Sequence, residues 1–162
     1  KRVLILLIAF LYLANFAYWM DQYFVHVNTH NAKYWQYGYK QAVQKVIEVQ
    51  KDYNQVVFVQ SFDQPYIYFL FYQKYDPEEY QKKAKLIPSF VGPNDVGFVE
   101  KLDNVSFELI DWPSHRGRKD TLFVGNTEQI PPTDSSDPKL FKVIGEIKYY
   151  NGTTALRLVE VL

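Results

Sequence analysis

The sequence offers few residues that could perform catalysis. The 162-residue chain contains no cysteine, which excludes thiolate metal sites, disulfides and a thiol nucleophile. No glycine-rich phosphate-binding loop occurs, and no serine lies in the context of a nucleophile elbow. His26 and His30 have the i, i+4 spacing of two metal ligands, but no nearby carboxylate completes a set. We therefore predict no catalytic residue, metal ion or cofactor in this chain.

Two short segments combine aromatic rings with amide or carboxylate groups. Aromatic rings stack on the CH faces of sugars, and amides or carboxylates hydrogen-bond to sugar hydroxyls. The alternative interpretation is that the rings pack helices together and that Asp63 caps a helix. The candidate contacts to a sugar or an acceptor are Tyr34, Trp35, Tyr37, Asp63, Gln64 and Tyr66.

The first twenty residues are expected to form a transmembrane helix. Residues 3–20 are uncharged, and eighteen helical residues span about 27 Å, close to the hydrocarbon thickness of a bilayer. Lys1 and Arg2 precede this run, which favours a cytoplasmic N-terminus and places residues 21–162 on the extracytoplasmic side of the cell membrane. The alternatives are a cleaved signal peptide and a buried core helix.

Two details favour a last helix of a larger bundle. Asn15 is the one polar side chain within the run, and such residues usually face other helices. The chain begins with Lys1 rather than Met, which indicates a piece of a longer protein. The alternative is that Asn15 lies near the outer membrane–water interface, where a polar side chain costs little free energy.

Charge excludes one class of partner. The chain carries 18 basic and 18 acidic residues and shows no basic stripe, which argues against nucleic acid. The aromatic share of 18% suits either a core rich in tyrosine or a surface that contacts carbohydrate or a membrane interface.

Residues 21–162 are predicted to form one soluble domain of the α/β or α+β class, after an irregular lead over 21–31. Asn31 is expected to cap the first helix, and Asp63 and Asp76 the next two. The domain should contain a mixed sheet of about five strands. The expected helices are about 32–52, 65–74 and 76–83, and the expected strands are 55–60, 105–111, 121–124, 142–150 and 153–161. Residues 86–103 and 130–138 should form loops, and residues 113–119 a basic turn.

The last two strands should form a hairpin around Asn151-Gly152. Both sides alternate between apolar and polar residues, and Asn-Gly is the preferred pair for a two-residue turn in which both residues have positive φ.

The order of these segments resembles a known family. An apolar span, then YWQYGYKQAV, a strand and DQPYIYFLFYQKYDPEEYQ is similar to the C-terminal end of bacterial membrane glycosyltransferases of family 39, which are similar to protein O-mannosyltransferases. The resemblance implies a polyprenyl-phosphate-linked sugar donor and a bundle of upstream membrane helices. The family's catalytic carboxylates lie after its first membrane helix, so none corresponds to a residue here.

This resemblance implies an accessory domain without catalytic residues that assists donor or acceptor binding. Its partners would be the lipid bilayer, upstream helices of the same protein, the polyprenyl-phosphate sugar and a glycan or protein acceptor. Two alternatives are a single-pass, membrane-anchored binding or sensor domain and a small secreted hydrolase released by signal cleavage.

Overall fold

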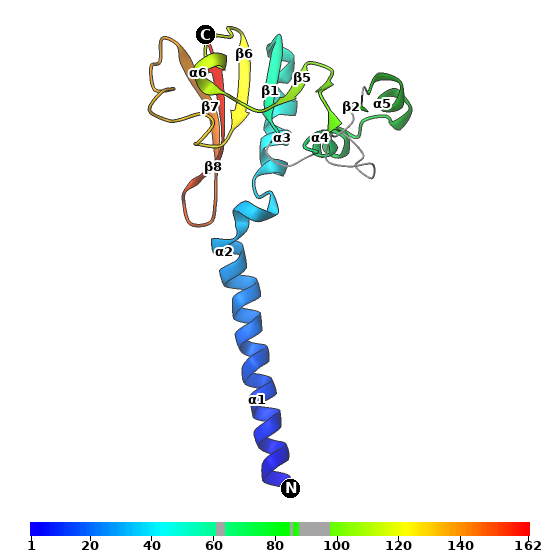
Figure 1. The fold of residues 1–162 in the computed structure, drawn as a ribbon, viewed down its shortest axis with the longest axis vertical. Helices are drawn as coiled ribbons and strands as arrows, with labels where there is room; N and C mark the ends of the chain where they lie inside the picture. The colour runs from blue at the N-terminus through cyan, green and yellow to red at the C-terminus, as the bar shows by residue number, and fades with distance from the viewer. Residues whose placement is uncertain (61–63, 85, 88–97) are drawn as a thin grey trace.

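The apolar N-terminal segment forms a long helix that projects from the domain built by the rest of the chain (Figure 1). The computed structural model describes residues 1–60, 64–84, 86–87 and 98–162. Helix α1 (Arg2–Asp21) has no buried residue, and it continues without a break through the π-helix η1 (Gln22–Val27) into α2 (Asn28–His30). This helix, Arg2–His30, is long and apolar enough to cross a membrane.

The expected irregular lead over 21–31 is wrong, because this segment is helical through His30. Two polar side chains support the last turns by hydrogen bonding to carbonyls one turn back. Asn28 Nδ2 donates to the Phe24 carbonyl at 2.9 Å, and Thr29 Oγ1 donates to the Val25 carbonyl at 2.8 Å. A π-helical stretch of this kind re-aims the side chains that follow it.

The single helix expected over 32–52 is divided into three pieces. A 3-10 turn, η2 (Ala32–Trp35), precedes α3 (Tyr39–Val49) and a second 3-10 turn, η3 (Gln50–Asp52). The break occurs because Gln36 (φ 55°) and Gly38 (φ 93°) adopt left-handed backbone conformations. Asn31 makes no side-chain capping bond, contrary to the prediction.

Six strands form one mixed sheet in the order β4-β5-β1-β6-β8-β7, which confirms the predicted fold class. The central strand β1 runs parallel to both neighbours, and Val57 lies opposite Ser106 of β5 and Phe123 of β6. A separate pair joins β2 (Leu86–Ile87) to β3 (Phe98–Val99). The strands of the main sheet are β1 (Gln55–Val59), β4 (Lys101–Leu102), β5 (Val105–Glu108), β6 (Thr121–Gly125), β7 (Phe141–Lys148) and β8 (Thr154–Val161).

The connections of the parallel strands contain the predicted short helices. Helices α4 (Tyr66–Gln73) and α5 (Pro77–Lys83) lie between β1 and β5, and α6 (Trp112–His115) lies at the start of the expected basic turn. Asp76 caps α5 as predicted, with its Oδ1 accepting from the Glu78 and Glu79 amides at 2.7 and 3.1 Å. The predicted cap Asp63 lies outside the described residues.

Helices cover both faces of the sheet. Because successive side chains of a strand point to opposite faces, Phe58 of β1 and the paired Val57–Phe123 set lie on different sides. Phe58 meets Tyr39 of α3 and Phe69 of α4, with ring centroids 5.6 and 5.2 Å apart, whereas Phe123 meets Trp112 of α6 at 5.6 Å. Burial on both faces explains why β1 reads as a continuous apolar run.

The C-terminal hairpin of β7 and β8 is confirmed, but its turn is not the expected two-residue type. The Gly152 amide donates to the Tyr149 carbonyl at 2.9 Å, and the Tyr149 amide donates to the Thr153 carbonyl at 2.8 Å. Of the two central residues only Gly152 has positive φ, at 83°. Asn151 Oδ1 instead accepts from the Thr153 amide, so the turn is a three-residue loop closed by a left-handed glycine.

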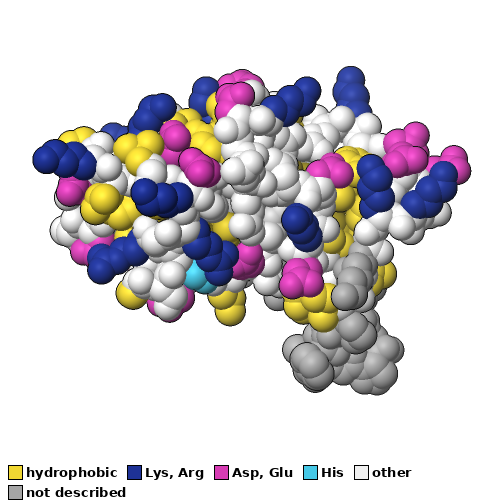
Figure 2. All heavy atoms as spheres, turned by 90° about the horizontal axis from the view of Figure 1, so that it is seen from above, with side chains coloured by type: hydrophobic (Ala, Val, Ile, Leu, Met, Phe, Trp, Pro, Cys, Tyr) yellow, Lys and Arg dark blue, Asp and Glu magenta, His cyan; other side chains and the backbone are white. Residues whose placement is uncertain are grey.

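The two ends of the domain differ in what they expose. The carboxyl ends of β1 and β6 and the turn of the hairpin face the end of α2, and the C-terminus lies at the opposite end (Figure 1). Seen from that opposite end, Lys and Arg side chains are spread over the surface together with Asp and Glu (Figure 2).

Candidate functional site

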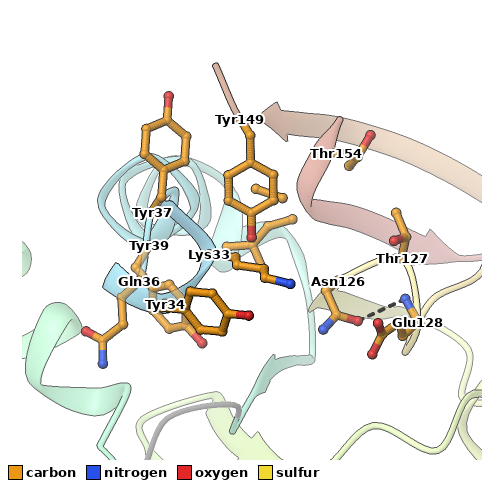
Figure 3. A pocket seen from close by; sticks show the side chains of 12 residues that line it. Lys33, Tyr34, Gln36, Tyr37, Tyr39, Asn126, Thr127, Glu128, Tyr149 and Thr154 are labelled. Atoms are coloured by element: carbon orange, nitrogen blue, oxygen red, sulfur yellow. Dashed lines mark hydrogen bonds between the residues drawn. The ribbon is translucent and has the colours of Figure 1, made fainter. Parts of the chain in front are cut away.

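A pocket of about 470 Å³ lies at the end of the domain that faces the apolar helix. Three segments far apart in the sequence form it: the connection from η2 to α3, the turn after β6, and the end of the C-terminal hairpin next to its turn (Figure 3). Its lining residues are Lys33, Tyr34, Gln36, Tyr37, Tyr39, Asn126, Thr127, Glu128, Tyr149, Thr154, Ala155 and Leu156.

The sheet topology reverses direction between β1 and β6. The strands β4 and β5, which follow β1 in the chain, lie on one side, whereas β7 and β8, which follow β6, lie on the other side. Such a reversal of direction leaves a crevice at the carboxyl ends of adjacent parallel strands, which is where open α/β sheets bind their ligands. The pocket lies at this end of the sheet, on the β6 side of the reversal, and none of its described lining residues belongs to β1.

A glycine and an asparagine build the pocket wall that follows β6. A Cβ on Gly125 would lie 3.1 Å from Ile110 Cδ1 and 3.2 Å from Gln129 Oε1, so a larger residue would push these two side chains aside. Asn126 Oδ1 then accepts from the Glu128 and Gln129 amides at 3.0 and 2.9 Å. These bonds fix the turn and hold Glu128 at the edge of the pocket (Figure 3).

Lys33 supplies a positive charge to the pocket. Its Nζ lies 4.8 Å from the centroid of the Tyr34 ring, and the side chain extends toward the wall formed by Asn126 (Figure 3). Burial raises the pKa of the Tyr149 hydroxyl, and the charge of Lys33 partly offsets this rise. Tyr149 therefore stays protonated at neutral pH and can donate a hydrogen bond.

Tyr37 connects the pocket to the hairpin turn. Its ring centroid lies 5.6 Å from that of Tyr149 and 5.2 Å from that of Tyr150. Burial, together with the neighbouring Tyr150 hydroxyl, raises the pKa of Tyr37. Gln36 points away from this cluster, and its Oε1 accepts a hydrogen bond from the Tyr68 hydroxyl of α4 (Figure 3). That bond anchors the left-handed backbone of Gln36 to the domain.

The described lining residues of the pocket provide one carboxylate, one ammonium group and several hydroxyl and amide groups. Glu128 is the one acidic residue among the described lining residues, so no carboxylate pair is available within this set. Nor do the described parts of the chain contain a group of three or more His, Asp or Glu residues that could hold a metal ion. Tyrosine faces, amides, hydroxyls and a single ammonium group match a sugar or a sugar phosphate.

The structure separates the six candidate residues predicted from the sequence. Tyr34 and Tyr37 line the pocket, whereas Trp35 lines a neighbouring hollow. Tyr66 is buried in the core, with ring centroids 6.1 Å from Tyr80 and 6.4 Å from Phe107, which is the packing arrangement given as its alternative.

The remaining two candidates are Gln64 and Asp63. Gln64 is half-buried ahead of α4 and lines neither hollow, and Asp63 lies outside the described residues.

Sequence reasoning missed most of the lining residues. Lys33 is adjacent to a predicted segment, but Asn126, Tyr149 and Thr154 come from segments assigned only to turns and strands. The available signals were an asparagine directly after a buried strand and a Tyr149-Tyr150 pair ahead of a hairpin turn. Neither signal indicates a site until the topology places the two segments beside Lys33.

The neighbouring hollow, of about 400 Å³, lies between the end of the long helix and the domain. Tyr37 lines both this hollow and the main pocket, so the two adjoin. Its lining residues are mainly apolar: Tyr23, Phe24, Val27, Asn28, Ala32, Trp35 and Tyr37.

Comparison with known proteins assigns no family. The sequence matches no protein-family model and no curated protein, and the fold matches no solved structure.

Proposed function

We propose that this chain is the non-catalytic, extracytoplasmic C-terminal domain of a membrane glycosyltransferase that uses a polyprenyl-phosphate-linked sugar donor. The observation that carries the proposal is the pocket of tyrosines, amides and Lys33 on the end of the domain that faces the apolar helix. In this role the pocket holds the polar part of the donor or of a glycan or protein acceptor. Catalytic groups come from upstream membrane helices of the same protein.

The chemistry of the pocket supports a ligand that combines a sugar with a phosphate. The Tyr34 and Tyr37 rings offer flat faces for the CH groups of a sugar, and Asn126 and Thr154 offer hydrogen bonds to its hydroxyls. Lys33 offers a point charge for a phosphate oxygen. A neutral glycan would use the same rings without needing the ammonium group.

A matched pair of lysine variants tests the role of Lys33. Lys33→Ala should weaken binding of a short-chain polyprenyl-phosphate sugar to the nanodisc-embedded chain by about one to two orders of magnitude, because a charge-assisted hydrogen bond is worth about 1.5–3 kcal/mol. Lys45→Ala removes an exposed lysine of α3 that pairs with Glu48 at 2.9 Å, outside the pocket, and should bind normally. Calorimetric titration measures both affinities.

Three results would contradict the proposal. Equal affinities for the two variants would remove Lys33 from the site, and no binding by the unaltered chain would remove the donor as its ligand. Measurable sugar transfer by this chain alone would show that it is not an accessory domain.

The same pocket also fits a single-pass, membrane-anchored binding or sensor domain. Because Glu128 is the one carboxylate among the described lining residues, the pocket suits ligand binding in this alternative as well as in an accessory domain. Binding of a free sugar or glycan with an affinity that a polyprenyl-phosphate group does not improve would support the anchored binding domain.

A further inference from the structure

The end of the domain nearest the long helix exposes large aromatic side chains. Trp35 is 76% exposed and Tyr150 is 70% exposed, and more than half of the surface of Tyr23 and Phe24 is accessible. We refer to Tyr23, Phe24, Trp35, Tyr37 and Tyr150 as the aromatic collar. Exposed apolar groups that gather in one place mark an interaction surface.

The collar is continuous across three segments of the chain. Tyr23 and Phe24 meet edge to face with ring centroids 5.0 Å apart, and both line the 400 Å³ hollow together with Trp35 and Tyr37. Tyr37 in turn contacts Tyr150 at the hairpin turn. The collar therefore joins the helix, the η2 turn and the hairpin into one surface around the base of the domain.

Helix geometry places Tyr23 and Phe24 at the level of lipid headgroups. The uncharged residues 3–20 span about 27 Å, which matches the hydrocarbon layer. Tyr23 and Phe24 then lie about 5–6 Å beyond that layer, and the headgroup region on each side is roughly 5–8 Å thick. Trp35 and Tyr37 follow the end of the helix at His30, about 15 Å beyond Met20, and their side chains line a hollow together with Tyr23 and Phe24.

We propose that the aromatic collar contacts the headgroup layer of the bilayer that α1 spans and so forms a second membrane attachment of the domain. Tyr and Trp favour this layer because their rings are apolar and their N–H and O–H groups stay hydrated. The collar is continuous with the apolar helix, whereas the opposite end of the domain carries mixed charges (Figure 2). This inference requires a spanning helix and does not depend on sugar transfer.

One consequence concerns the pocket. Tyr37 belongs both to the collar and to the pocket lining. Contact of the collar with lipid therefore sets the pocket beside the headgroups, where polar parts of membrane lipids are presented.

Tryptophan quenching in nanodiscs tests this contact on the full chain. The three tryptophans are Trp19 in α1, Trp35 in the collar and Trp112 in the core. In Trp19→Phe, lipids brominated close to the headgroup should quench the emission of Trp35 more than lipids brominated near the chain ends. The double variant Trp19→Phe/Trp35→Phe retains only the buried Trp112 and should lose this quenching.

A second position gives an independent reading. Because the chain has no cysteine, Tyr150→Cys can carry an environment-sensitive fluorophore, with Ser136→Cys on an exposed loop as the control. In nanodiscs, the fluorophore at Tyr150→Cys should emit at a shorter wavelength than the fluorophore at Ser136→Cys.

Two outcomes would overturn the proposal. Quenching of Trp35 by aqueous acrylamide but not by brominated lipid would show that the collar stands clear of the bilayer. Protection of Trp35 from both quenchers would show that protein covers it, either a second copy or other helices.

Discussion

Gly38 is the residue at which the chain that leaves the long helix turns onto the sheet. Its φ of 93° lies in the region that favours glycine, and a Cβ would approach Ile147 Cγ2 to 3.1 Å and Ala155 Cβ to 3.6 Å. Both backbone strain and crowding against the hairpin therefore oppose a side chain at this position. The residue sets the relation between η2, which carries Lys33, and the hairpin that forms the other wall of the pocket.

We predict that Gly38→Ala lowers the free energy of unfolding by about 1–3 kcal/mol, because alanine must adopt the left-handed region and displace Ile147. Gly117→Ala is the matched control, since a Cβ there meets nothing within 4 Å and should leave stability nearly unchanged. Urea unfolding in mild detergent measures both. Equal midpoints for the two variants would refute this role of Gly38.

At the scale of elements, β8 fastens the loop after β6 to the hairpin. Arg157 is buried, and its Nε donates to Glu146 Oε1 of β7 at 2.9 Å. Its second guanidinium nitrogen donates to the Ile130 carbonyl at 3.0 Å and to Ser135 Oγ at 2.7 Å. One side chain thus ties β7, β8 and the proline-rich loop together, and the pocket turn at Asn126 lies at the start of that loop.

Arg157→Ala should destabilise the domain by about 2–4 kcal/mol, because it leaves buried acceptors without their charged donor. Lys142→Ala breaks an exposed ion pair to Glu160 on the same two strands and should change stability by less than about 1 kcal/mol. Thermal unfolding monitored by near-ultraviolet circular dichroism compares them. A loss as small as that of the control would mean that the Arg157 contacts contribute little.

Elements with a strong local signal were predictable from the sequence. Three elements are specified by neighbouring residues in the sequence: the β-branched run of β1, the Asp76-Pro77 start of α5 and the alternating strands of the hairpin. Gln36 carries no such signal, because its left-handed backbone is associated with a hydrogen bond from Tyr68, over thirty positions away. The pocket was missed for the same reason, since Asn126 and Tyr149 meet Lys33 only through the tertiary fold.

At the scale of the whole molecule, a long helix joins a domain whose pocket faces that helix. If α1 spans the membrane with Lys1 and Arg2 on the cytoplasmic side, every described part of the domain lies outside the cytoplasm. Because the chain contains no cysteine, a single introduced cysteine is its only thiol, and labelling of that thiol reports on which side of the membrane it lies.

Ser136→Cys should react with a membrane-impermeant maleimide in intact cells, since this exposed loop residue belongs to the extracytoplasmic domain in the proposed orientation. Lys1→Cys should react only after permeabilisation. The opposite labelling pattern would reverse the orientation and would contradict the proposed localisation.

The placement of the pocket beside the base of the helix has a consequence for how a ligand arrives. A ligand carried on a lipid would reach it by lateral diffusion in two dimensions rather than from bulk solution. Confinement of both partners to a thin layer raises their local concentration above that in bulk solution. A weak site built from a few tyrosines and a single lysine would then be filled at ordinary lipid abundance, and rapid release would follow from the same weakness.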